Sequence, residues 1–289
     1  MSEERELSRR AMLRGTAGAA VAAGVVGTVL SAGGSAYGAE DDCPGGRRVP
    51  PERIAIQLYT LRSALQADLP GTLEALADIG YRNVELAGTY GRSAAEFRAM
   101  LDRYHLRAVS AHIGLEDIDQ LVADARTLGY RWADCAWANL GSIEAWTDFA
   151  RRLDKAGEAF RKAGISYGYH NHAHEFWPID GVRPFDVIAR NTSRRNIHFQ
   201  YDLYWLVEAG VDPVEQFYAQ FGRVRQFHVK DRAADGSFAD LGTGTIDFAR
   251  VFRMTRNTGV KHFIVEHDQP TDPLHTAKVG YEYLRDLRF

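Results

Sequence analysis

Three short apolar segments in the C-terminal third decide the fold: Asn196-Ile-His-Phe-Gln-Tyr-Asp202, Val224-Arg-Gln-Phe-His228 and His262-Phe-Ile-Val-Glu266. Each has the β-branched and aromatic residues of a buried strand and ends on a side chain that can bind a metal. A fourth segment, Ile165-Ser-Tyr-Gly-Tyr-His170, leads into a histidine-rich stretch that ends on Glu175. Because a parallel β-barrel gathers the ends of its strands on one face, these positions predict a metal-dependent enzyme.

The order of elements along the chain predicts a closed barrel. Amphipathic stretches such as residues 69–79 separate the short apolar runs, and glycines such as Gly80 and Gly164 stand where helices should end. Strands that alternate with helices pair in parallel through right-handed crossovers. We therefore predict a (β/α)8 TIM barrel; an open doubly wound sheet fits less well, because no phosphate-binding loop follows the first strand. The eight predicted strands are Ile54–Tyr59, Asn83–Ala87, Arg107–Ile113, Trp132–Trp137, Ile165–His170, Ile197–Asp202, Val224–Val229 and Phe263–Glu266.

The first 39 residues predict an export signal. Arg9 and Arg10 precede an uncharged stretch rich in glycine and alanine, residues 15–34, and small residues at 36–39 offer a cleavage site. The stretch is too weakly hydrophobic to predict a spanning helix, although an uncleaved anchor is the alternative. We expect a twin-arginine signal peptide that takes the chain to the cell envelope or the outside, with no stable membrane insertion after processing.

Residues 40–53 predict a linker rich in proline, glycine and charge, and residues 54–289 suit one barrel-sized domain. The formal net charge is -3; residues 1–39 carry four arginines and three glutamates, so the remainder carries -4. Proteins that bind nucleic acids usually carry a net positive charge or a basic patch, so we expect no nucleic-acid partner. The sequence leaves open whether the chain forms a homo-oligomer. Cys43 and Cys135 do not form a disulfide framework.

Strand parity sharpens the predicted site. Side chains alternate between the two faces of a strand, so Gln200 shares a face with Asp202 and Gln226 shares one with His228. The inward sets end in polar groups and predict a cup for a polar ligand. Glu85 and His112 end the second and third strands in the same way, and we expect both to contact substrate.

These residues resemble the xylose-isomerase-like barrels, a group of sugar isomerases and epimerases related in fold to endonuclease IV. The resemblance covers nearly all of residues 54–289, and its motifs are specific in their order and spacing. The motifs are Gln57-Leu-Tyr-Thr-Leu-Arg62, Gly80-Tyr-Arg-Asn-Val-Glu85, Tyr169-His-Asn-His-Ala-His-Glu-Phe176, Tyr201-Asp202, His228-Val-Lys-Asp231, Leu241-Gly-Thr-Gly-Thr-Ile-Asp-Phe248 and Val265-Glu266.

The resemblance implies one divalent metal held by residues that end the last four strands. Asp202, His228 and Glu266 match the family pattern directly. On the fifth strand His170 stands where many relatives have a glutamate, so Glu175 is the expected fourth ligand and His170 the alternative. Three carboxylates and one imidazole favour Mn²⁺ or Mg²⁺, with Zn²⁺ or Co²⁺ also possible.

The implied chemistry is proton abstraction next to the carbonyl of a sugar or keto-sugar. The candidate bases are His170, His172 and Glu266, and Lys230 is expected to offset the developing negative charge. Return of the proton gives isomerisation or epimerisation; loss of a β-substituent gives a lyase or dehydratase acting on 3-keto-glycosides. Because we expect the protein to be exported, we expect its substrates to be sugars or glycosides without phosphate.

Aromatic residues near the ends of strands offer surfaces for a sugar ring. Tyr59 and Trp205 are the expected substrate contacts of this kind, although such residues often only pack. Two other functions stay open: a nuclease like endonuclease IV, and a carbohydrate-binding barrel without catalysis. The nuclease needs more metal ligands than the sequence offers, and the binder needs no metal.

Overall fold

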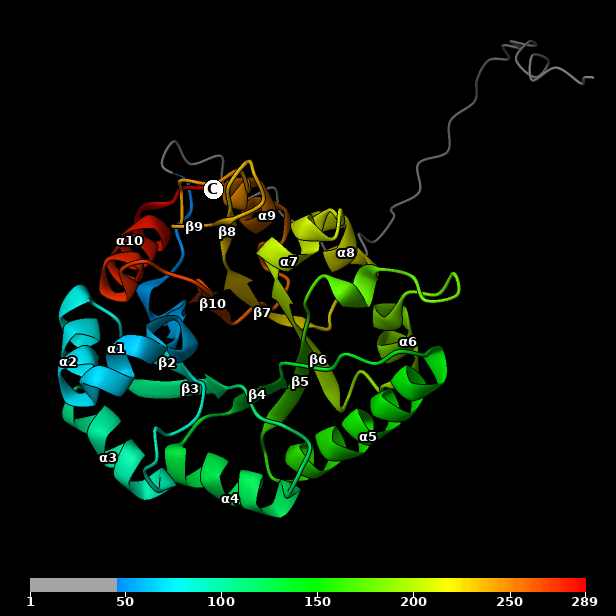
Figure 1. Ribbon diagram of the computed structural model, residues 1–289, viewed down its shortest axis with the longest axis horizontal. Coiled ribbons are helices and arrows are strands. Elements are labelled where there is room, and N and C mark those ends of the chain that lie inside the picture. The colour runs from blue at the N-terminus through cyan, green and yellow to red at the C-terminus, as the bar shows by residue number, and fades with distance from the viewer. Residues whose placement is uncertain (1–45) are drawn as a thin grey trace, which may run out of the picture. The chain divides into compact units, whose positions relative to one another are not determined.

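The computed structural model describes residues 46–289, and within them eight parallel strands form a nearly closed barrel inside a ring of helices (Figure 1). The TIM barrel expected from the sequence is confirmed. The strand order is β3-β2-β1-β10-β7-β6-β5-β4. The barrel strands are β1 (Ile54–Gln57), β2 (Asn83–Leu86), β3 (Arg107–Ala111), β4 (Trp132–Cys135), β5 (Ser166–His170), β6 (Ile197–Asp202), β7 (Val224–Val229) and β10 (His262–Val265).

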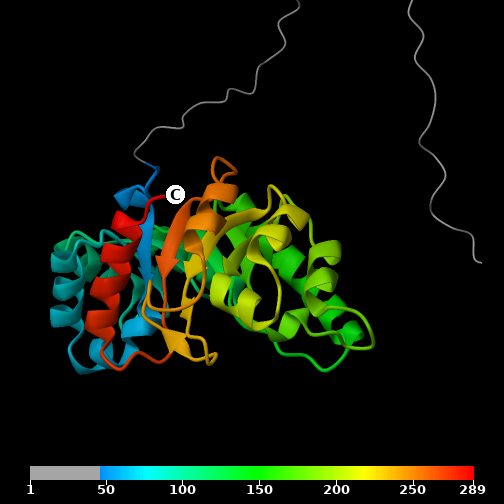
Figure 2. The ribbon, with the colours of Figure 1, turned by 90° about the horizontal axis from the view of Figure 1, so that it is seen from above.

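Helices connect these strands and lie outside the barrel, to the left and right of the strands in Figure 2. Their N-termini carry the expected caps; in α3, for example, Ser93 and Glu96 form a reciprocal capping box. The helices are α1 (Arg62–Ala67), α2 (Leu69–Ile79), α3 (Ala94–Arg103), α4 (Ile118–Leu128), α5 (Ile143–Lys162), α6 (Pro184–Asn191), α7 (Leu203–Glu208), α8 (Pro213–Ala219), α9 (Phe248–Met254) and α10 (Pro273–Asp286). Short 3-10 turns lie at Pro51–Arg53, Leu58–Leu61 and His174–Phe176, and β8 (Asp231–Arg232) pairs with β9 (Phe238–Ala239).

The apolar core lies between the barrel and the helices, as strand parity predicts. Phe199, Tyr201 and Phe227 point outward from their strands and are fully buried under the helices. The inward positions are mostly polar, among them Glu85 and Gln200, and both are fully buried too. The barrel interior is therefore a polar column inside an apolar shell, and its polar groups must bind one another.

Several predicted strands end earlier than expected. The first strand stops at Gln57, whose side chain accepts a hydrogen bond from the backbone N–H of Tyr59 and starts a 3-10 turn. This local cap satisfies a backbone donor that a longer strand would have paired with a neighbour. Tyr59 thereby leaves the sheet and reaches the rim of the barrel, where its side chain is exposed.

The expected linker is in part attached to the barrel. Arg47 exchanges two backbone hydrogen bonds with Phe289, and Val49 is buried. The described part of residues 40–53 thus packs beside the C-terminus (Figure 1). The predicted signal peptide, residues 1–39, lies outside the described residues. No helix within residues 46–289 is long and apolar enough to cross a membrane.

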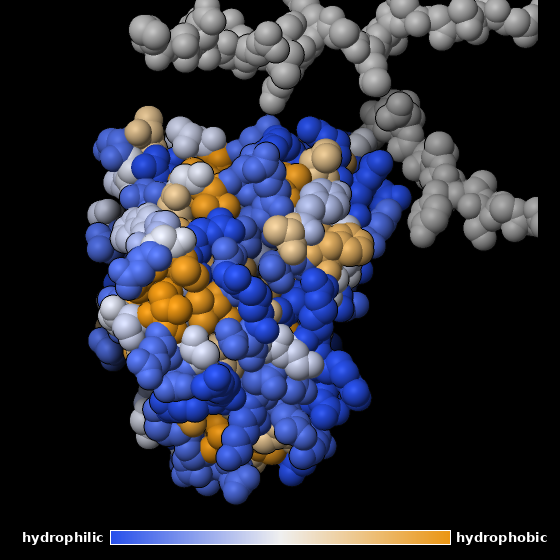
Figure 3. Space-filling view, turned by 90° about the vertical axis from the view of Figure 1, so that its right-hand side faces the viewer, coloured by the Kyte–Doolittle hydropathy of each residue, from blue (hydrophilic) through white to orange (hydrophobic). Residues whose placement is uncertain are grey.

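The outer surface is mainly hydrophilic on the side shown in Figure 3, where α5, α6 and α8 form the wall. Separate apolar areas interrupt the polar surface. Tyr218 and Phe221, at the end of α8, are the exposed aromatic residues of that helix and its following turn. Isolated apolar side chains of this kind are normal on a protein surface.

Candidate active site

A cavity of about 690 Å³ opens at the C-terminal ends of the barrel strands. This is the face on which the sequence places the site. Seven of the predicted site residues lie in its wall: Tyr59, His112, His170, His172, Trp205, Lys230 and Glu266. Asp202 and His228 lie just beneath, fully buried.

Four side chains on the cavity floor form a group that could hold a metal ion: His170, Asp202, His228 and Glu266. Their ligand atoms all lie within 4.8 Å of one another. They come from the ends of β5, β6 and β7 and from the residue after β10. Parallel strands with the same inward parity bring these atoms together from positions almost a hundred residues apart.

Asp202 has two functions in this geometry. Its Oδ1 accepts a hydrogen bond from the backbone N–H of Trp205 at 3.1 Å and caps α7. Its Oδ2 lies 2.9 Å from Nζ of Lys230 and 3.8 Å from Nε2 of His170. The helix-cap and metal-ligand interpretations of this residue are therefore compatible, because each uses a different oxygen.

A hydrogen-bonded network beneath the floor holds the imidazoles in place. Glu85 is fully buried, and its carboxylate accepts hydrogen bonds from Gln57 and Gln200, both at 2.7 Å. Gln200 Oε1 in turn lies 2.8 Å from a ring nitrogen of His112 and 2.9 Å from one of His170. Glu85 thus lies below the cavity rather than in its wall. The expected contact of Glu85 with substrate stays a prediction; in this geometry its carboxylate contacts the side chains beneath the cavity.

His228 lies between two carboxylates. Its Nδ1 is 2.8 Å from Glu266 and its Nε2 is 2.5 Å from Glu85. Burial lowers the pKa of His228, but the negative charges of Glu266 and Glu85 outweigh it and raise the pKa to about 10. Burial likewise raises the pKa of Glu85, while His112 and His228 lower it to a net value of about 2. These carboxylates are ionised at neutral pH.

Lys230 is a buried cation on the same floor. Its Nζ lies 2.9 Å from Asp202, 2.7 Å from Glu266 and 2.9 Å from Asp268. Burial disfavours the ammonium, but the three carboxylates outweigh it and raise its pKa well above the usual value. Asp231, the residue after Lys230, instead accepts backbone hydrogen bonds from Gly242 and Gly244 and orders that loop.

Glu175 does not reach the group of ligands. Its carboxylate accepts a hydrogen bond from the hydroxyl of Tyr169 at 2.8 Å and one from the backbone N–H of His172 at 2.9 Å. Tyr169 faces the helix layer, where its ring packs on Phe149 of α5. Glu175 is therefore held on the outer side of the strand, and burial raises its pKa. His170, the alternative from the sequence, is the fourth member of the group that could hold a metal ion.

Two cavity residues have a buried polar atom without a hydrogen-bond partner among the described residues. These atoms are Nδ1 of His172 and Nε1 of Trp205. Burial and the charge of Lys230 lower the pKa of His172 to about 3, so its ring is neutral at pH 7. A neutral imidazole and an indole N–H are groups that a substrate rich in hydroxyls can satisfy.

Sequence reasoning missed several residues of the cavity wall. Asp268 follows Glu266 at the same strand parity, so the alternation rule that found Glu266 could also have found Asp268. Arg62 donates to the backbone carbonyl of Asp268 and lies over the ring of Tyr59. The rim also carries two aromatic residues, Trp137 and Trp177, which are 61% and 54% exposed.

The chain matches the family described as the xylose isomerase-like TIM barrel over residues 73–287. This match covers well over half of the sequence and includes every proposed metal ligand. The chain belongs to the xylose isomerase-like TIM barrel family.

Curated relatives in this family are named for enzyme activities or for catabolism. An inosose dehydratase of Geobacillus kaustophilus is 23% identical over 83% of this chain and 96% of its own length. The rhizopine catabolism protein MocC of Rhizobium meliloti is 25% identical over 73% of this chain and 79% of its own length. The match to the dehydratase covers most of this chain and nearly all of that enzyme. This member of the xylose isomerase-like family is itself an enzyme.

Solved structures agree with the fold. A sugar phosphate isomerase/epimerase of Parabacteroides distasonis superposes with a TM-score of 0.71 at 24% identity, covering 82% of this chain and 94% of that one. An L-ribulose 3-epimerase superposes with a TM-score of 0.63 at 17% identity, covering 80% and 93%. Isomerase, epimerase and dehydratase names therefore occur together among proteins of this barrel.

The floor of the family barrel fits a divalent ion. Its donor set is two imidazoles and two carboxylates, and their ligand atoms all lie within 4.8 Å of one another. Without a metal, four carboxylates (Glu85, Asp202, Glu266, Asp268) face one ammonium and one imidazolium, a net charge of -2 from the groups named above. His228 would release a proton on binding a metal, because an imidazole binds metal only in its neutral form. With His170 instead of Glu175 as the fourth residue, the donor set has two nitrogen and two oxygen atoms. Such a set favours Mn²⁺, Co²⁺ or Zn²⁺ over Mg²⁺.

Proposed function

We propose that the protein is a divalent-metal-dependent enzyme that abstracts a proton next to the carbonyl of a sugar-like substrate. One observation carries this proposal: His170, Asp202, His228 and Glu266 converge on the floor of a cavity that also holds a buried lysine. Such a site combines positive charge for a developing oxyanion with several groups that can move a proton.

His170, Asp202, His228 and Glu266 would hold the ion, with Mn²⁺ as the first choice. A bound divalent ion supplies Lewis-acid stabilisation of negative charge on substrate oxygens. Lys230 lies beside the same carboxylates and keeps its ammonium charged, so its positive charge can offset negative charge that develops on a substrate oxygen. Glu85 orients His228 from below.

The proton must move to a group in the cavity wall. The Nδ1 of His172 lies in the cavity and has no partner among the described residues, so this nitrogen is placed to accept a proton from substrate. His112 lies across the floor, its ring 4.8 Å from that of His170, and offers a second imidazole. The imidazole of His112, just after β3, and that of His172, in the loop after β5, can thus act at different positions of one substrate.

Elimination of water from a keto-polyol or keto-sugar is the outcome that the relatives favour. The inosose dehydratase match spans nearly the full length of that relative. Isomerisation or epimerisation is the second candidate, because the cavity offers more than one imidazole and return of the proton needs a second group. The first step, removal of the proton next to the carbonyl, is the same in both.

The cavity wall favours a substrate without phosphate. Lys230 is bound by three carboxylates, and Arg62 donates to the backbone carbonyls of Tyr59 and Asp268. The described wall therefore holds no free cluster of cations for a phosphate group. Aromatic rings at the rim, those of Trp137 and Trp177, suit the apolar face of a sugar ring or glycoside.

We infer further that Arg9 and Arg10 direct the folded chain out of the cytoplasm, and that the protein has no nucleic-acid partner. Replacement of both arginines by lysine should leave the precursor inside the cell. Export equal to that of the parent would contradict the twin-arginine signal.

The activity test compares metal-loaded and metal-stripped protein in deuterated water. Substrates are an inosose, unmodified keto-sugars and 3-keto-glycosides, and mass spectrometry records deuterium uptake or loss of a β-substituent. We expect a metal-dependent product with at least one substrate class. The stereochemistry of recovered substrate must also be checked, because a base that returns the same proton gives no uptake. Absence of isomer, epimer and elimination product, together with nicking of abasic DNA, would establish the nuclease alternative.

A further inference from the structure

The barrel has one weakly paired junction, the seam between β3 and β4, which are the two ends of the strand order. Neighbouring strands elsewhere in the barrel share three or four paired positions. Here one parallel bridge, His112 with Asp134, and the hydrogen bond from Ile113 N–H to the Asp134 carbonyl hold the upper part together. Below that point the two strands separate.

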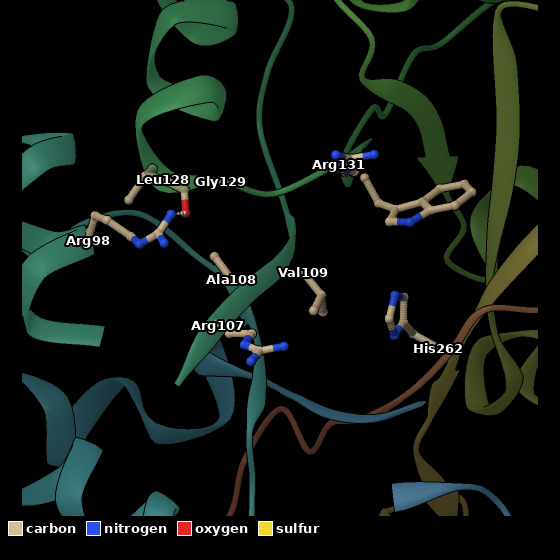
Figure 4. Close-up of a pocket in the computed structure, with 9 residues that line it drawn as sticks. Arg98, Arg107, Ala108, Val109, Leu128, Gly129, Arg131 and His262 are labelled. Atoms are coloured by element: carbon tan, nitrogen blue, oxygen red, sulfur yellow. Dashed lines mark hydrogen bonds between the residues drawn. The ribbon is translucent and has the colours of Figure 1, made fainter. Parts of the chain in front are cut away.

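A bulge in β3 accounts for the separation. In the pairing with β2, Val84 faces Ala108 but Glu85 faces Ser110, so Val109 is an extra residue without a partner. A bulge bends its strand and increases the local twist, which turns the lower half of β3 away from β4. Val109 itself lies at the opening (Figure 4).

The seam contains a cavity of about 260 Å³, the space of about eight water molecules. Its wall includes three arginines, and Figure 4 shows them with Val109 and His262 around the opening. Arg98 is bound to Asp102 through its Nε and donates to the Leu128 carbonyl. Arg107 and Arg131 are exposed and have no ion-pair partner among residues 46–289.

His262 gives the cavity a polar inner wall. It is an inward residue of β10, opposite Gln226 of β7, so the cavity passes through the seam into the lower barrel. Its Nδ1 is buried without a hydrogen-bond partner in the described part of the chain. A buried polar atom of this kind is unfavourable unless water or a ligand binds it.

The cavity lies in a cationic end of the barrel, although the whole chain carries a net charge of -3. A lysine or arginine stands at or just before the start of six of the eight barrel strands. Because the strands are parallel, these residues lie at one end, opposite the catalytic cavity. They are Arg53, Arg82, Arg107, Arg131, Arg223 and Lys261.

We propose that the seam cavity binds a phosphate-type oxyanion, at a site separate from the catalytic one. Guanidinium groups match the geometry of phosphate oxygens and form charge-assisted hydrogen bonds with them. Arg107 and Arg131 supply the unpaired guanidiniums on either side of the seam, and His262 supplies a polar group at its inner end. The ligand replaces the missing contacts between the lower halves of β3 and β4 and stabilises the barrel.

The test is calorimetric titration of the full chain with inorganic phosphate, against chloride at the same ionic strength. We expect saturable binding to the parent protein that weakens at least ~10-fold in the double variant Arg107→Gln/Arg131→Gln. Arg152→Gln, an exposed arginine of α5, is the matched control and should bind phosphate like the parent. Thermal unfolding without phosphate checks that all three proteins fold alike.

Phosphate should also raise the melting temperature of the parent and of Arg152→Gln more than that of the double variant. Equal stabilisation of all three proteins would indicate general exclusion of phosphate from the protein surface and would overturn the proposal. So would absence of binding to the parent. A parallel titration with glycerol phosphate identifies the source of the group: tighter binding than inorganic phosphate indicates a monoester, and equal binding indicates the free ion.

Discussion

The two ends of the barrel differ in charge and in packing. At the C-terminal ends of the strands, Asp202, Glu266 and Asp268 surround one buried lysine in a closed network of short contacts. At the N-terminal ends, arginines such as Arg107 and Arg131 stand unpaired beside a seam that has lost its strand pairing. One end concentrates negative charge in a buried floor; the other exposes positive charge to water.

This difference follows from chain direction. In a parallel barrel, every residue just after a strand lies at one end and every residue just before a strand lies at the other. The sequence can therefore place opposite charges on opposite ends without any long-range rule. The comparison teaches that charge position relative to strand ends indicates where a cation and an anion would bind. The predictions below test the two ends separately.

The largest effect should come from the ligands at the C-terminal end. Glu266→Gln and Asp202→Asn should lower turnover by ~10³-fold or more and abolish stoichiometric metal binding, because each removes a charged ligand. Metal content by mass spectrometry and steady-state rates measure this. Circular dichroism should show a folded barrel. Full metal retention in Glu266→Gln would contradict the assignment.

The fifth-strand ligand gives the next test. His170→Ala should weaken metal binding by ~100-fold, whereas Glu175→Gln should leave it within a few-fold of the parent. The reason is that His170 lies on the floor and Glu175 is bound to Tyr169 on the outer side. Direct titration with Mn²⁺ distinguishes them. Loss of metal binding in Glu175→Gln but not in His170→Ala would show that Glu175 is the fourth ligand, as expected from the sequence.

The N-terminal end should show a pH effect on stability. Burial lowers the pKa of His262 to about 4, with Arg53 and Lys261 also lowering it and Glu85 opposing them. As the pH falls, His262 is protonated in the unfolded chain before it is protonated in the folded chain. The free energy of unfolding therefore decreases between about pH 6.5 and about pH 4, and this group causes no further decrease below that range. The loss from this group should be about 2 kcal/mol, less than the full pKa difference because the ring is partly exposed.

Urea unfolding at several pH values measures that loss. His262→Gln should remove this part of the slope, while His275→Gln, at an exposed position of α10, serves as the control. An unchanged slope between pH 6.5 and pH 4 in His262→Gln would show that other groups cause it.

The smallest effect should come from the rim. Trp177→Ala should raise KM by ~5-fold to ~10-fold and leave kcat and metal content unchanged, because stacking on a sugar ring adds about 1 kcal/mol. Tyr218→Ala, an exposed aromatic of α8, is the control and should change neither constant. A fall in kcat without a change in KM would show that Trp177 acts on the reaction step instead.

Some features of the site could be predicted from the sequence, and others could not. The eight strands, the parity of their inward residues and the placement of Asp202, His228 and Glu266 follow from a period of two and from chain direction, which are local properties. The position of Glu175 does not, because it lies in a loop whose direction depends on a hydroxyl of Tyr169 and a backbone N–H.

Sequence alone determined the barrel, the end that carries the site and three of its four proposed ligands. Tertiary structure decided that His170 completes the group, that Glu85 lies beneath it, that Lys230 binds three carboxylates, and that β3 and β4 part below Asp134. The physical reason is the range of the forces involved. Alternation and strand ends are fixed within a few residues, whereas hydrogen-bond partners of buried polar groups are fixed only when distant strands meet.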